Sequence, residues 1–114
     1  MKFIEAIARM EGWGVKGAIP TRDNNPGDID NGKFAQAHGA LPNTPGRFAQ
    51  FPTAEAGLAA LRALLAQHYI GLTVTAALNK YAPPVENNTN RYVGCVCEWT
   101  GLTPETILTA ENIG

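Results

Sequence analysis

The sequence predicts a mainly α-helical domain with a small β-hairpin and loop lobe. Three observations support this fold class. Apolar residues recur at helical spacing in several segments, Thr, Asn and Gly stand where helices would begin or end, and one long stretch is rich in Gly and Pro. With 114 residues, of which 45% are hydrophobic and 17% charged, the chain has the length and composition of a single domain over residues 1–114.

The first predicted helix covers residues 2–11. Ile4, Ile7 and Ala8 follow the spacing of one helical stripe, and the next position of that stripe is Glu11. Gly12 follows directly and is expected to end the helix. The apolar stripe therefore ends in a carboxylate.

The segment after this helix, residues 12–52, is predicted to be mostly loop. Within it, residues 33–35 and 47–51 are expected to be short strands on either side of a long turn, which would form the β-lobe. Loops of this length in small domains usually serve a function. We therefore expect this segment to contribute to a functional site.

Four further helices are predicted, over residues 53–69, 73–81, 87–99 and from 103 onward. Thr53 and Thr73 are good N-caps, because a Thr hydroxyl can accept a hydrogen bond from a free amide of the first turn. Gly101 is expected to close the third of these helices. Pro104 would occupy the first position of the last one.

Composition and charge exclude several classes of protein. Nine Lys and Arg residues against ten Asp and Glu give a net charge of −1, which argues against nucleic-acid binding and against attachment to an anionic membrane. No run of about 18 apolar residues could span a bilayer. Cys95 and Cys97 lie too close in sequence to pair, and His38 and His68 have no ligand spacing. We expect no metal and no cofactor.

Glu11 is the most informative candidate for chemistry. A carboxylate that continues an apolar stripe is expected to lose part of its hydration, which favours the neutral form that a general acid needs. Trp13, two residues further on, could supply an aromatic wall for a substrate. The alternative is that the last turn frays and Glu11 simply reaches water.

Two further segments carry polar groups suited to a saccharide. The loop over residues 22–30 contains Asn25, Asp28 and Asp30, but lacks the spacing of an EF-hand and could equally be a solvated turn. We expect only one of these two carboxylates to face a cleft. Tyr81 and Tyr92 could stack on sugar rings, or could serve only for packing.

Four motifs, in the order in which they occur along the chain, resemble those of a known family of domains. The sequences MEGWG (10–14), NNPGDI (24–29), FAQFPTAEAGLAALRALL (48–65) and YAPPVENNTNRYV (81–93) resemble small peptidoglycan-cleaving domains of the lysozyme-like superfamily. The similarity is to phage and prophage lysozymes of the endolysin type and, more distantly, to lytic transglycosylases. It covers residues 3–102, nearly the whole chain.

This resemblance implies a function and a set of site residues. Glu11 matches the catalytic acid, Asn25 and Asp28 match a cleft loop, Gln50 matches the β-lobe strand and Tyr92 matches a cleft tyrosine. Asp28 and Asp30 are then the candidates for a second carboxylate. Relatives often have Ser where this chain has Gly12, and commonly have Asn at the position of Asp28.

The implied reaction is cleavage of the β-1,4 bond between amino sugars in peptidoglycan, by hydrolysis or by lytic transglycosylation. The expected partner is the glycan strand, and the protein is expected to act as a monomer. Because the N-terminus lacks the pattern of a signal peptide, we expect synthesis in the cytoplasm and action on the cell wall after release or secretion. The rival hypothesis is a non-catalytic glycan-binding or virion structural module of the same shape.

Overall fold

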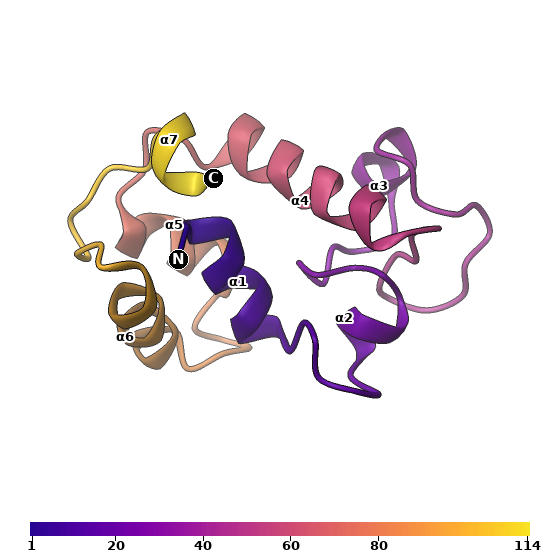
Figure 1. Ribbon diagram of the computed structural model, residues 1–114, viewed down its shortest axis with the longest axis horizontal. Helices are drawn as coiled ribbons and strands as arrows, with labels where there is room; N and C mark the ends of the chain where they lie inside the picture. Colours follow the sequence, from indigo (N-terminus) through magenta and orange to yellow (C-terminus); the bar gives the residue numbers. More distant parts are fainter.

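The computed structural model describes residues 1–114 and confirms a mainly helical fold. Its seven helices are α1 (Phe3–Glu11), α2 (Ile19–Arg22), α3 (Lys33–Ala37), α4 (Ala54–His68), α5 (Val74–Tyr81), α6 (Thr89–Thr100) and α7 (Ala110–Ile113). Figure 1 shows α1, α5, α6 and α7 gathered in one helical body, while α2 and α3 lie in a lobe made largely of loops. The helix α4 runs along one side of the molecule and joins the two parts.

The helix α1 lies at the centre of the body and packs against α6, α4 and α7. Its buried face includes Phe3 and Ile7, both fully shielded from solvent. Gly12 ends the helix in the left-handed conformation (φ 99°), and its amide donates to the carbonyl groups of Ala8 and Arg9. The apolar stripe predicted from the sequence is therefore the face that α1 turns toward the core.

The ends of α4, α5 and α6 confirm the capping pattern of the sequence. The hydroxyl of Thr53 accepts from the amide of Ala56, and the hydroxyl of Thr73 accepts from the amide of Ala76. Gly101, at φ 78°, terminates α6. These hydrogen bonds satisfy amides that a helix leaves free in its first turn, and a left-handed glycine lets the chain leave the last turn.

The expected strands over residues 33–35 and 47–51 were wrong. Residues 33–37 form the short helix α3, whose Lys, Ala and Gln residues are good helix formers. The segment 47–51 does run antiparallel to another segment, but its partner is residues 29–31, with one isolated bridge between Asp30 and Phe48. Left-handed residues such as Asp28 (φ 50°) interrupt the extended backbone before a longer ladder can form.

The last helix also begins later than expected. Thr103 and Thr106 close a hydrogen-bonded turn instead of opening a helix, and α7 begins after Thr109, whose hydroxyl accepts from the amide of Asn112. The segment between this turn and α7 pairs with the start of α5, where Ile107 lies opposite Thr73. It carries Leu108 into the core, where this side chain is fully buried. Burial of this leucine is the physical reason for the later start.

One hydrophobic core of 20 buried residues joins the body to the lobe. The radius of gyration, 13.4 Å, is the value expected for a folded domain of this length. None of the helices has the combination of length and apolar character needed to cross a membrane.

At the junction of lobe and body, Gly57 lets the loop approach α4 closely. A Cβ atom at this position would lie 1.8 Å from the carbonyl oxygen of Asn24 and 2.9 Å from the ring of Pro26. Only glycine fits there, so the loop before Asp28 rests directly on the helix backbone. This contact positions the loop that carries part of the candidate site.

Candidate active site

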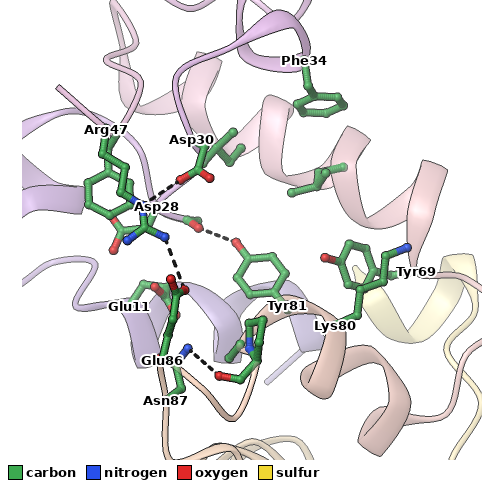
Figure 2. Close-up of a pocket in the computed structure, with 16 residues that line it drawn as sticks. Glu11, Asp28, Asp30, Phe34, Arg47, Tyr69, Lys80, Tyr81, Glu86 and Asn87 are labelled. Atoms are coloured by element: carbon green, nitrogen blue, oxygen red, sulfur yellow. Dashed lines mark hydrogen bonds and ion pairs between the residues drawn. The ribbon is translucent and has the colours of Figure 1, made fainter. Parts of the chain in front are cut away.

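A groove of about 560 Å³ lies between the loop lobe and the helical body. Its lining includes carboxylates, two cations and four aromatic rings (Figure 2), namely Glu11, Asp28, Asp30, Glu86, Arg47, Lys80, Phe34, Phe48, Tyr69 and Tyr81. The lining comes from α1, the loop after α2, α3, the segment around Phe48, α4 with the residue that follows it, and the end of α5 with the loop after it.

Glu11 lies at the end of α1 and is half-buried at the floor of this groove. It remains helical, so the alternative of a frayed last turn is wrong. The hydroxyl of Tyr92, a buried residue of α6, donates to Glu11 Oε2 at 2.8 Å. Burial and the negative charge of Glu11 raise the pKa of Tyr92, which keeps the hydroxyl protonated as a donor.

Asp28 faces Glu11 from the loop. Its Oδ1 atom is buried, and no N–H or hydroxyl group of the protein donates to it. Burial, then the charge of Glu11 and a hydrogen bond between the two carboxyl groups, raise the pKa of Asp28 from 3.8 to about 7, while the charge of Arg47 opposes this. Near neutral pH, a substantial fraction of the Asp28 carboxyl groups is therefore protonated.

Asn25 holds this loop in place and does not contact the groove. It is fully buried, its Nδ2 donates to the carbonyl groups of Ile29 (3.0 Å) and Ala49 (2.9 Å), and its Oδ1 accepts from the amide of Ile29 (2.9 Å). The expectation that Asn25 binds substrate was wrong, because each polar atom of its side chain is already engaged inside the protein. Its three hydrogen bonds fix the turn that presents Asp28.

Tyr81 closes the turn from the opposite side. Its hydroxyl donates to the carbonyl oxygen of Gly27, and a Cβ at Gly27 would lie 2.7 Å from both this hydroxyl and Leu61. The ring of Tyr81 lines the groove and packs at an angle on Tyr69, with the ring centres 5.6 Å apart. The hydroxyl is occupied within the protein, whereas the ring forms part of the groove wall.

Arg47 joins the two sides of the groove. Its guanidinium contacts Asp30 at 3.4 Å and Glu86 at 3.5 Å (Figure 2). Asp30 and Asp28 both line the groove, so the expectation that only one would do so was wrong. Ile29, which lies between them, is buried in the core.

A second, smaller cavity of about 210 Å³ adjoins Glu11. Its six lining residues are Met10, Glu11, Asn87, Asn88, Arg91 and Tyr92. Glu11 and Asn87 belong to the lining of both cavities. Tyr92, predicted as a substrate contact, therefore lies beside Glu11 on this smaller side.

Trp13 and Gln50 line neither cavity, so the structure does not bring them to the site. The left-handed turn at Gly12 reverses the chain directly after Glu11, and the amide of Trp13 donates back to the carbonyl of Ala8. The backbone carbonyl of Gln50 accepts a hydrogen bond from the backbone amide of Leu41 at 2.8 Å. Trp13 was predicted from its position two residues after Glu11, and Gln50 from its match to the β-lobe strand of the family that the chain resembles.

Several groove residues were not found from the sequence, including Arg47, Lys80 and Tyr69. The pairing of Asp30 with Phe48 explains the position of Arg47, because the register places residues 30 and 47 side by side. Lys80 donates to the carbonyl of His68 at 2.7 Å and lies over the ring of Tyr69. These contacts join residues far apart in the chain, so no periodicity or motif of the sequence predicts them.

No three His, Cys, Asp or Glu side chains gather in a way that could hold a metal ion. Comparison of the chain with protein-family models, curated proteins and solved structures found no match in any of the three. The function therefore has to be inferred from the groove and its carboxyl pair.

Proposed function

We propose that this protein cleaves the β-1,4 linkage between amino sugars in peptidoglycan glycan strands. The observation that carries the proposal is the Glu11–Asp28 pair, two neighbouring carboxyl groups that line an open groove, where burial and the charge of Glu11 raise the pKa of Asp28 to about 7. Cleavage of a glycosidic bond requires a proton for the leaving oxygen, and a carboxylic acid supplies it only if its environment keeps it protonated.

The proposed proton donor is Glu11, with Asp28 as its neighbouring carboxyl group. The hydroxyl of Tyr92 holds Oε2 of Glu11 and fixes the direction of the carboxyl group. Transfer of a proton from this carboxyl group to the glycosidic oxygen allows the bond from that oxygen to the anomeric carbon to break. The aromatic and amide groups of the groove are suited to the faces and acetamido groups of amino sugars.

The contact between the two carboxyl groups favours one outcome of the reaction. Acid and base are about 6.5–9.5 Å apart in inverting glycosidases, and acid and nucleophile are about 5–5.5 Å apart in retaining ones. Asp28 lies within hydrogen-bonding reach of Glu11, so we propose that it does not activate a separate water placed between the two groups. Attack by the substrate's own 6-hydroxyl, with its proton returned to the carboxyl pair, would yield a 1,6-anhydro product, as in a lytic transglycosylase.

The test is digestion of purified peptidoglycan, followed by mass spectrometry of the released fragments. We expect wild-type protein to release fragments that end in 1,6-anhydro sugar, and Glu11→Gln to reduce the rate about 10²–10⁴-fold because the amide has no proton to donate. Glu98→Gln is the matched control, since Glu98 is exposed on α6 and lines neither cavity. Circular dichroism checks that both variants fold.

Two results would change the proposed function. Release of ordinary reducing ends would indicate hydrolysis instead of transglycosylation. Binding of glycan strands without any cleavage by wild-type protein would favour the rival function, a non-catalytic glycan-binding module.

A further inference from the structure

The smaller cavity continues the site on the other side of Glu11. It shares Glu11 and Asn87 with the groove, so the two cavities meet at the residue proposed to donate the proton. A polymer that is cut in its interior has sugar units on both sides of the reacting bond. If the groove holds one side of the glycan strand, the smaller cavity is the space available to the other.

The cations near the carboxyl pair differ in their partners. Arg47 is already paired with Asp30 and Glu86, and Lys80 donates to a backbone carbonyl. The guanidinium of Arg91, which is the cation of the smaller cavity, makes no ion pair and no hydrogen bond within the protein. It is therefore free to bind an anion.

The backbone of Arg91 is nevertheless well fixed. The residue lies in the first turn of α6, and its amide donates to the side chain of the N-cap residue Asn88 at 3.2 Å. The next residue of the same helix, Tyr92, holds Glu11. The position of Arg91 relative to the proposed proton donor is thus set by a single rigid element.

We infer that the smaller cavity receives a sugar unit that carries a carboxylate, and that Arg91 pairs with this carboxylate. The inference rests on the proposed function and deepens it by naming the chemistry of one substrate unit. In peptidoglycan, a carboxylate near the glycan backbone comes from the peptide attached to the lactyl group, or from the lactyl group itself after the peptide is removed. The side-chain nitrogen of Asn87 donates to the carbonyl of Pro83 at 3.4 Å, so its side-chain oxygen is the atom left to accept from the neutral part of the same unit.

Binding can be measured separately from cleavage in a Glu11→Gln background, where the ligand remains intact. Three ligands of similar length are compared by calorimetry: a glycan fragment with its peptides, the same fragment after an amidase has removed them, and a neutral N-acetylglucosamine oligomer. Adding Arg91→Gln is expected to weaken binding of a carboxylate-bearing ligand about two- to fivefold at low salt, the range for an exposed ion pair. The neutral oligomer is expected to bind unchanged.

Lys16→Gln is the matched control, because it removes one positive charge from an exposed residue that lines neither cavity. It is expected to leave all three affinities unchanged, and the effect of Arg91→Gln is expected to disappear at high salt. Weaker binding of both acidic ligands would assign the lactyl carboxylate, and weaker binding of the peptide-bearing ligand alone would assign the peptide.

An equal loss for the neutral oligomer, no loss for any ligand, or no binding of any ligand to the Glu11→Gln protein would overturn the inference about Arg91. Failure of wild-type protein to cleave peptidoglycan, with the charge-selective loss still present, would overturn the proposed reaction and leave the binding site for a carboxylate-bearing sugar.

Discussion

Replacement of Asp28 by Asn is expected to stabilise the folded protein at neutral and alkaline pH. In the folded state, burial and then the charge of Glu11 raise the pKa of Asp28 from its ordinary value of 3.8 to about 7. The folded protein therefore binds a proton more strongly than the unfolded chain does. The stability that this proton contributes is fully present below pH 3.8 and is lost as the pH rises through about 7. Asn cannot ionise, so the variant avoids this loss.

The size of this stabilisation follows from the difference between the pKa of Asp28 in the folded protein and its ordinary pKa in the unfolded chain. Each pH unit between them corresponds to about 1.4 kcal/mol, so roughly three units give a ceiling of about 4 kcal/mol. Because the carboxyl group of Asp28 is partly open to the groove, solvent screening reduces the expected gain to about 1–2 kcal/mol. The backbone adds little cost, since Asn tolerates the left-handed conformation found here (φ 50°).

Urea denaturation of both proteins between pH 4 and pH 9 measures this difference. We expect the free energies of unfolding to agree near pH 4 and the variant to be more stable by about 1–2 kcal/mol at pH 8. Asp30→Asn is the control, because Asp30 is exposed and paired with Arg47, so it should give no gain that grows with pH. A gain that does not depend on pH, or a less stable Asp28→Asn protein at pH 8, would refute the raised pKa of Asp28.

Two further predictions concern the support of the site. Tyr92→Phe removes the hydroxyl that donates to Glu11 at 2.8 Å, and we expect glycan turnover to fall about tenfold while the free energy of unfolding changes by about 1 kcal/mol. Unchanged turnover in the digestion assay would show that this hydrogen bond does not orient the acid. Gly57→Ala places a methyl group against the carbonyl of Asn24, and we expect it to lower the free energy of unfolding, measured by heat or urea, by at least about 2 kcal/mol. Gly94 lies in open space on a helix, so Gly94→Ala is expected to raise the free energy of unfolding by about 0.5–1 kcal/mol. Equal effects of the two alanines would contradict the close contact of loop and α4.

The sequence alone determined most of the helix ends. The caps at Thr53 and Thr73 join a side chain to an amide three residues away, and the turns at Gly12 and Gly101 depend on one residue's freedom to adopt positive φ. Such interactions are complete within four or five residues. They are therefore specified by the local sequence whatever the rest of the chain does.

Where two local solutions competed, only the tertiary structure decided between them. Both Thr103 and Thr109 could open a helix, and burial of Leu108 selected the later one. The segment 47–51 could pair with more than one neighbour, and its partner proved to be residues 29–31 instead of 33–35. A strand gains its hydrogen bonds from another segment, so its own residues do not identify that partner.

The site shows the same division. The periodicity of α1 predicted that a carboxylate would lie at the end of the apolar stripe, and Glu11 does lie there, half-buried. Asn25 points into the protein, and Asp28 lies next to Glu11, because of the shape of one loop. This loop is turned by left-handed residues and rests on the backbone of Gly57. These contacts join positions far apart in the chain, and their energies depend on burial that exists only after the lobe and the body have packed together.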